Sequence, residues 1–144
     1  MFVDTNIFVP ARNIRAPASA VARAALVRAQ ESGERVHICR QVISEYLSAV
    51  TRPQTWSDPL PMAEALKDAG WMGAAFEILE DGPKVTEMLV ALCREVPVAG
   101  KQIHDANIAA TMLAHGERRL LTFNATDFRR YGARIELVEM QTPD

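Results

Sequence analysis

Short apolar runs alternate with longer amphipathic stretches along the 144-residue chain. The apolar runs predict buried strands at 1–4, 36–39, 120–123 and 135–138. Apolar positions at helical spacing predict a helix from Pro17 to the turn at Gly33, and further helices over about 41–51, 61–80, 83–96 and 103–115. Because parallel strands need crossover connections, this alternation predicts an α/β fold with a short parallel sheet.

Proline and glycine mark the ends of these elements. Pro53 ends the helix 41–51, and Gly116 closes the last helix. The tripeptide Asp81-Gly82-Pro83 separates two helices within the region 54–99, which we expect to form a helical-pair insertion. No repeat, linker or low-complexity stretch divides the chain, so residues 1–144 are predicted to form a single domain.

The composition is that of an ordinary globular protein, with 49% apolar residues. No apolar stretch approaches the roughly 20 residues that a membrane-spanning helix needs. The N-terminal sequence MFVDTNIFV lacks the features of a signal peptide, and Cys39 and Cys93 have no CxxC spacing. These features predict a cytoplasmic protein with reduced thiols and no membrane partner.

The net charge of −2 conceals an uneven distribution. Residues 1–52 carry a net charge of +3, residues 53–99 a net charge of −5, and the remainder is balanced. Of the 16 basic residues 13 are arginine, whose planar guanidinium suits phosphate. A total close to zero therefore does not exclude a nucleic-acid partner.

Three acidic residues stand where an active site could form, although each also has a structural explanation. Asp4 follows the first predicted strand, where α/β proteins bind ligands, but it could simply cap a helix that begins at Thr5 or Asn6. Glu45 flanks the apolar stripe of the helix 41–51 and could extend to solvent. Asp105 lies in the first turn of its helix, where the helix dipole favours an acid.

Together the three acids suggest a metal site. Carboxylates that converge at one edge of a sheet repel one another unless a cation binds, and oxygen-only ligands select Mg²⁺ or Mn²⁺. The histidines at 37, 104 and 115 have no common metal-ligand spacing. We expect structural roles for His37 and His115, and at most a supporting role for His104.

Four sequence blocks carry a family resemblance: FVDTNIFV, QVISEYLSAVTRP, KQIHDANIAATMLAHG and LLTFNATDFRRY. In this order they resemble the PIN-domain ribonucleases, and among them the VapC-type toxins of bacterial toxin–antitoxin pairs. The resemblance spans residues 2 to about 138. It implies a three-layer α/β/α fold with an acidic pocket that binds Mg²⁺ or Mn²⁺ and hydrolyses RNA, giving a 5′-phosphate and a 3′-hydroxyl.

Carried over residue by residue, the resemblance makes Asp4, Glu45 and Asp105 the three acids of the family pattern. Asp4 and Asp105 are the expected metal ligands, and Glu45 could ligate, or orient or deprotonate the attacking water. The fourth acidic position is occupied by Asn124, a departure from a four-acid site that Asp127 could compensate. The resemblance also assigns pocket-supporting roles to Thr5, Asn6 and Thr122.

Cations around an acidic pocket would help to hold a polyanion. The candidates for RNA binding are Arg12, Arg15, Arg129, Arg130 and Arg134. The resemblance further implies a cognate antitoxin and a homodimer. Trp56 and Trp71, in the acidic helical region, could form such protein contacts, or could pack inside the domain.

Other functions remain open at this level. A haloacid-dehalogenase-like phosphotransferase would also have an aspartate after its first strand, but it needs a second aspartate where this chain has Asn6. A receiver-like signalling domain would need a phosphorylatable aspartate after a later strand, which 36–39 does not supply. A non-toxin RNA-processing nuclease and a non-catalytic, protein-binding PIN domain are the alternatives within the resemblance.

Overall fold

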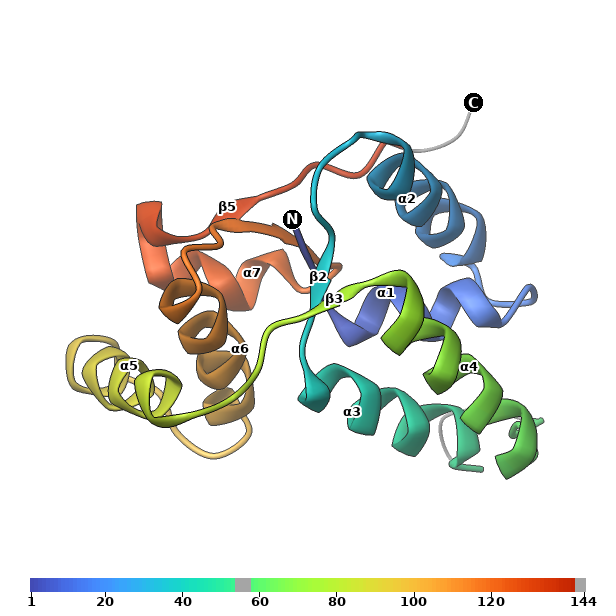
Figure 1. The fold of residues 1–144 in the computed structure, drawn as a ribbon, viewed down its shortest axis with the longest axis horizontal. Helices are drawn as coiled ribbons and strands as arrows, with labels where there is room; N and C mark the ends of the chain where they lie inside the picture. Colours follow the sequence, from blue (N-terminus) through green and yellow to red (C-terminus); the bar gives the residue numbers. More distant parts are fainter. Residues whose placement is uncertain (54–57, 142–144) are drawn as a thin grey trace.

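A parallel five-stranded sheet forms the centre of the computed structural model, which describes residues 1–53 and 58–141 (Figure 1). The strand order is β3-β2-β1-β4-β5. The strands are β1 (Phe2–Val3), β2 (His37–Ile38), β3 (Glu77–Ile78), β4 (Arg119–Leu121) and β5 (Glu136–Leu137). The first strand is central and fully buried, which agrees with its unbroken apolar sequence.

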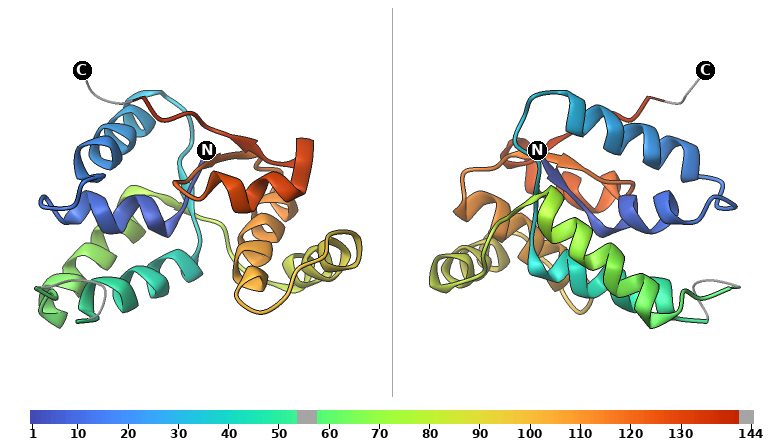
Figure 2. Two further views of the ribbon diagram at one scale, coloured as in Figure 1. Left: turned by 180° about the vertical axis from the view of Figure 1, so that it is seen from behind. Right: turned by 45° about the vertical axis from the view of Figure 1, so that its right-hand side comes forward.

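Helices cover both faces of the sheet. They are α1 (Thr5–Arg12), α2 (Ser19–Glu31), α3 (Arg40–Thr51), α4 (Met62–Ala75), α5 (Pro83–Glu95), α6 (Gln102–Ala114), α7 (Ala125–Phe128) and the 3₁₀ helix η1 (Arg129–Arg134). Helices α1 to α4 lie on one side, and α5 to α7 lie on the other (Figures 1 and 2). The predicted three-layer α/β/α arrangement is therefore confirmed.

The core explains why these layers stay together. Phe2, Ile38 and Leu120 are fully shielded from solvent in three neighbouring strands. Helix α3 contributes Val42 from one layer and α6 contributes Ile108 from the other, both buried. This packing holds the carboxyl ends of the strands in fixed positions relative to one another.

The prediction of one helix over 61–80 is wrong at its C-terminal end. Helix α4 ends at Ala75, and Glu77 and Ile78 form the edge strand β3, paired with β2. The region 54–99 therefore contributes to the sheet and is not only a helical pair. A two-residue strand is too short to show an alternating pattern, so only its pairing partner reveals it.

Other boundaries agree closely with the sequence. Gly33 and Gly116 adopt positive φ angles of 77° and 73° after α2 and α6, as expected for residues that close helices. Helix α2 begins at Ser19, slightly later than the position of Pro17 predicts. Helix α1, which the pattern left as one alternative, begins directly after Asp4.

In the described part of the chain, every helix is too short or too polar to span a membrane. Trp71 is 47% exposed on α4 and packs edge-to-face against Phe76, with ring centroids 5.3 Å apart. Its indole thus combines intramolecular packing with an accessible face. Trp56 lies outside the described residues.

Candidate active site

Asp4 lies between β1 and α1, at the carboxyl edge of the central strand. Its Oδ1 accepts a hydrogen bond from the Thr5 backbone N–H (2.7 Å) and caps α1. Its Oδ2 accepts a hydrogen bond from the hydroxyl of Thr122 (2.7 Å), which follows β4. Asp4 therefore does cap a helix, as its structural explanation predicts. Its second oxygen is directed away from the cap, toward the hydroxyl that follows β4.

Asp4 is held in an environment that resists its ionisation. The side chain is buried, and this burial is the main reason why its pKa rises from 3.8 to about 6. Hydrogen bonds from Thr122 and Thr5 act in the opposite direction, whereas the charges of Glu45 and Asp105 raise the pKa further. The three acids selected from the sequence are thus coupled electrostatically across separate elements.

Glu45 is half-buried on α3, and both of its oxygens are engaged. Oε2 accepts a hydrogen bond from the Thr5 hydroxyl (2.8 Å), and Oε1 accepts one from Gln41 Nε2 (2.7 Å). Thr5 therefore contacts Asp4 through its backbone and Glu45 through its side chain. This one residue connects two of the three acids.

Asp105 occupies the first turn of α6, in the opposite helical layer. Its pKa is raised by burial and by the charges of Asp127 and Glu45, and it is lowered by Arg130 and His104. Arg130 donates from Nε to the Asp127 backbone carbonyl (2.8 Å), and its Nη2 lies 3.9 Å from the Asp127 carboxylate. Asp127 and Arg130 thus form a charged pair whose field reaches Asp105.

Thr122 organises the remaining polar positions. Its Oγ1 accepts hydrogen bonds from Asn6 Nδ2 (3.0 Å) and from the Asn124 backbone N–H (2.9 Å). Asn6 Oδ1 in turn accepts from the Phe123 backbone N–H (3.0 Å). Thr5, Asn6 and Thr122 therefore belong to one hydrogen-bond network, in which Asp4 connects Thr5 to Thr122. The Asn124 side chain itself is exposed.

The five candidate arginines do not lie in one patch. Arg130 is near the carboxylates, whereas Arg12 pairs with Asp68 (Nε–Oδ2 2.9 Å) and Arg134 pairs with Glu95. Arg15 and Arg129 are exposed. Of the five, Arg130 is the arginine whose charge acts on an acid of the site.

The histidines lie as expected. His37 Nδ1 lies 2.7 Å from Glu117, at the opposite edge of the sheet, and His115 Nε2 lies 2.8 Å from the Glu80 carbonyl oxygen. His104 is exposed beside Asp105 and favours its ionised form. Within residues 1–53 and 58–141, no three acidic, histidine or cysteine side chains stand at metal-ligand spacing.

The chemistry of the carboxyl edge nevertheless fits a hard divalent cation. Asp4 and Asp105 offer only oxygen ligands, which suit Mg²⁺ or Mn²⁺. Glu45 raises the pKa of both, so the cluster has an excess of negative charge that a cation would offset. Asp4 and Asp105 are the residues that could hold such an ion.

Sequence reasoning missed Gln41 and Asn107, two neutral residues of the same region. Gln41 bonds to Glu45, and Asn107 Nδ2 donates to Gln41 Oε1 (2.9 Å). The spacing of Gln41 and Glu45, four residues apart on one helix, could have indicated their contact. Nothing in the sequence pairs Gln41 with Asn107, which lies 66 positions away.

Comparison with known proteins gives a family match over most of the chain. The PIN domain family matches residues 1–134. Ribonuclease VapC24 of Mycobacterium tuberculosis (strain CDC 1551 / Oshkosh) is 28% identical over 132 residues, which cover 90% of each chain.

Solved structures share the fold at lower sequence identity. VapBC2 from Rickettsia felis, bound to a DNA fragment from its promoter, matches with a TM-score of 0.70 and 20% identity, over 95% of this chain and 96% of that one. Mycobacterium tuberculosis VapC20, a sarcin-ricin loop cleaving toxin, matches with a TM-score of 0.69 and 16% identity, over 91% and 94% of the two chains. The fold of this chain therefore agrees with these solved structures over nearly its whole length.

Proposed function

Because the chain belongs to the PIN domain family, we propose that it is a metal-dependent endoribonuclease and the toxin component of a type II toxin–antitoxin system. The observation that carries the proposal is the electrostatic coupling of Asp4, Glu45 and Asp105 at the carboxyl edge of the sheet. The name of the relative VapC24, a ribonuclease, supports the activity. Membership of this family removes the haloacid-dehalogenase-like alternative.

In the proposed mechanism Asp4 and Asp105 would hold Mg²⁺ or Mn²⁺. When bound, such a cation acidifies water and offsets the charge that builds on the phosphoryl oxygens. Glu45, fixed at both oxygens by Thr5 and Gln41, orients the attacking water and accepts its proton. The water oxygen bonds to phosphorus as the bond to the 3′-oxygen breaks, and the 3′-oxygen takes a proton from solvent, which leaves a 5′-phosphate and a 3′-hydroxyl.

Asp127 is the stronger candidate for the fourth acidic function. Its charge raises the pKa of Asp105, which places it within electrostatic reach of the site. Asn124 can bind water or a cation through its amide oxygen, but it cannot act as a base at neutral pH. We therefore assign the missing negative charge to Asp127 and a water-holding role to Asn124.

Arg130 is the best-placed contact for the RNA backbone. It is 25% exposed, paired loosely with Asp127, and close enough to Asp105 to lower its pKa. Arg15 and Arg129 are exposed cations that could extend the contact along the strand. Because phosphate contacts release counterions, RNA binding should weaken steeply as salt increases.

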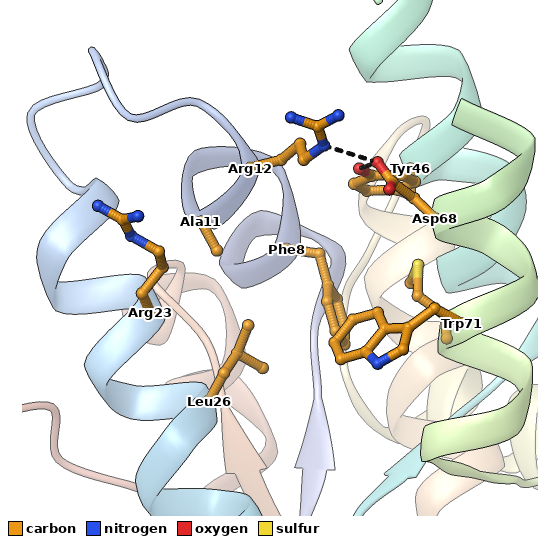
Figure 3. A pocket seen from close by; sticks show the side chains of 9 residues that line it. Phe8, Ala11, Arg12, Arg23, Leu26, Tyr46, Asp68 and Trp71 are labelled. Carbon is orange, nitrogen blue, oxygen red and sulfur yellow. Dashed lines mark hydrogen bonds and ion pairs between the residues drawn. The ribbon is translucent and has the colours of Figure 1, made fainter. Parts of the chain in front are cut away.

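For the proposed antitoxin, the exposed side of α4 offers a contact surface. Trp71 is 47% exposed there. It lines a largely apolar cavity of about 240 Å³ between α1, α2, α3 and α4 (Figure 3). Its lining comprises Phe8, Ala11, Arg12, Arg23, Leu26, Tyr46, Asp68, Trp71 and Met72. The structures of toxin–antitoxin complexes with this fold, one from Klebsiella pneumoniae, support such a partner. A homodimer is proposed on the family resemblance alone.

Nuclease activity is tested by RNA cleavage with Mn²⁺, with EDTA, and in the variants Asp4→Asn and Asp105→Asn. We expect EDTA to abolish cleavage and each variant to lose about 100-fold or more in rate. The matched control is Asp81→Asn, an exposed aspartate outside the site, which should retain full activity. Cleavage that persists in both site variants would contradict the assignment of a metal-dependent endoribonuclease. A protein that binds Mn²⁺ without cleaving RNA would favour a protein-binding PIN domain.

The antitoxin surface is tested by co-expression with the product of the neighbouring upstream gene. Trp71→Glu should abolish co-purification, because it places a charge at the rim of the cavity. Val90→Glu, a similar change on the exposed side of α5, should leave the complex intact. Equal recovery of both complexes would refute this surface, and the absence of any partner would favour a non-toxin nuclease.

A further inference from the structure

One side-chain amide, that of Gln41, connects α3 to α6 at the carboxyl edge of the sheet. Its Nε2 donates to Glu45 Oε1 (2.7 Å) and to the His104 backbone carbonyl (3.2 Å). Its Oε1 accepts a hydrogen bond from Asn107 Nδ2 (2.9 Å). His104 and Asn107 flank Asp105 along α6, so a single amide links the helices that carry two of the three acids.

The two helices belong to different layers. Helix α3 packs mainly against α1 and α4, whereas α6 packs mainly against α5 and α7 (Figures 1 and 2). Their relative position at the edge of the sheet is therefore not fixed by extensive contact between them. The hydrogen bonds of Gln41 supply a direct link between these layers.

The chemistry of Gln41 suits this place for two reasons. The Glu45 carboxylate and the His104 carbonyl only accept hydrogen bonds, so the amide NH₂ must face them and the amide oxygen must face Asn107. The amide also carries no charge. A lysine or arginine at this position would hold Glu45 equally well but would compete electrostatically with a bound cation.

We propose that Gln41, oriented by Asn107, is a positioning residue that fixes the Glu45 carboxylate relative to Asp105, so that the negative charge of Glu45 strengthens binding of a divalent cation by Asp4 and Asp105. This inference rests on the proposed metal-dependent function and adds to it two neutral residues. Thr5 holds one oxygen of Glu45 and Gln41 holds the other, so the carboxylate is fixed in orientation as well as in position. Asn107 acts through Gln41.

The first experiment measures the Kd for Mn²⁺ by isothermal titration calorimetry in Gln41→Met, which keeps the length of the side chain and removes both hydrogen-bonding groups. We expect a Kd about 10-fold higher, the lower end of the range for loss of a residue that supports a metal site without binding the ion. Gln30→Met, the same change at an exposed position of α2, is the control and should leave the Kd unchanged. Thermal unfolding without metal shows how far each variant is destabilised.

The second experiment asks whether the effect passes through Glu45. In a Glu45→Gln background, Gln41→Met should raise the Kd no further. Asn107→Ala should weaken Mn²⁺ binding less than Gln41→Met does, and should add nothing to it in the double variant. Asn107→Ala also keeps the inference testable if Gln41→Met does not fold.

The outcomes separate this inference from the proposed function. If Gln41→Met and Asn107→Ala bind Mn²⁺ as the unaltered protein does, with only a lower Tm, the amide is merely structural and the positioning role is overturned. An additive loss in the Glu45→Gln background overturns it as well. Failure of the unaltered protein to bind Mn²⁺ overturns the metal-dependent function and, with it, this inference.

Discussion

The two edges of the sheet each contain a well-shielded carboxylate, Asp4 at the carboxyl edge and Glu117 at the amino edge. The Glu117 side chain is 11% exposed, and Asp4 is 8% exposed. Although burial acts to raise the pKa of Glu117, hydrogen bonds from the Met1 amine (2.8 Å), the Arg119 N–H and His37 hold it below its usual value. The pKa of Asp4 is raised to about 6, because its burial is reinforced by Glu45 and Asp105.

Burial raises the pKa of both groups, and the neighbours determine the opposite directions of the net shifts. At the amino edge, a carboxylate is surrounded by donors and positive charge, so that its ionised form stabilises the fold. At the carboxyl edge, acids surround an acid and the fold bears an electrostatic cost that a cation would relieve. An acid cluster whose burial and repulsion outweigh its internal compensation is the better indication of a site.

The largest expected contrast is in catalysis, between Glu45→Gln and Glu117→Gln. Both replace a carboxylate by an amide of the same shape. We expect RNA cleavage to fall about 100-fold in Glu45→Gln, because the proton acceptor is lost, and to stay within about 3-fold in Glu117→Gln. Cleavage assays below the Tm of both variants provide the measurement. An equal loss of cleavage activity in both variants would contradict a catalytic role that is specific to the carboxyl edge.

The next contrast is in stabilisation by metal. Mn²⁺ at 100 times its Kd should add about 2.7 kcal/mol to the free energy of unfolding of the unaltered protein. Glu117→Gln should retain this increment, whereas Asp4→Asn should lose most of it. Because Mn²⁺ must displace the proton of Asp4, the increment at a fixed Mn²⁺ concentration should shrink as the pH falls below about 6. A pH-independent shift in Tm would contradict the assignment of Asp4 as ligand.

Without metal, Asp4→Asn is expected to stabilise the protein. The pKa of Asp4 is about 6 in the folded state against 3.8 for the ordinary group, so folding opposes its ionisation. The stability of the unaltered protein is highest, in this respect, below pH 3.8 and declines as the pH rises through about 6. The variant should therefore gain about 3 kcal/mol above pH 6 and little near pH 4, measured by urea unfolding in EDTA. A variant that is destabilised at pH 7 would show that the cap on α1 outweighs the charge.

Glu117→Gln should show the opposite pH dependence and the smallest effect. A lowered folded-state pKa stabilises the fold above the ordinary value of 4.5, and this contribution is lost as the pH falls through the lower folded value. We expect a loss of about 1–2 kcal/mol at pH 7 that diminishes below pH 4.5. The same urea titrations provide the comparison. Parallel pH profiles for the two variants would contradict the contrast between the edges.

Much of this could be predicted from the sequence, because the relevant features are local. Asp4 directly follows a buried apolar run, Asp105 occupies a first helical turn, and both positions can be identified without the fold. Strand β3 could not be predicted, since Glu77 and Ile78 become a strand only through pairing with β2. Likewise, the sequence could not predict that Arg12 pairs with Asp68, which lies 56 positions away.

The sequence by itself determined the α/β class and the parallel sheet, and it singled out Asp4, Glu45 and Asp105 as candidate acids. Only the tertiary structure decided which carboxylates lie close enough to shift one another's pKa, and that Thr5 and Gln41 hold Glu45. It also decided that the charge of the Glu117 carboxylate is balanced by the Met1 amine. The physical reason is the distance along the chain over which each effect acts. Strand, helix and cap preferences act over a few residues, whereas a pKa depends on every charge that folding brings within several ångströms, regardless of its distance along the chain.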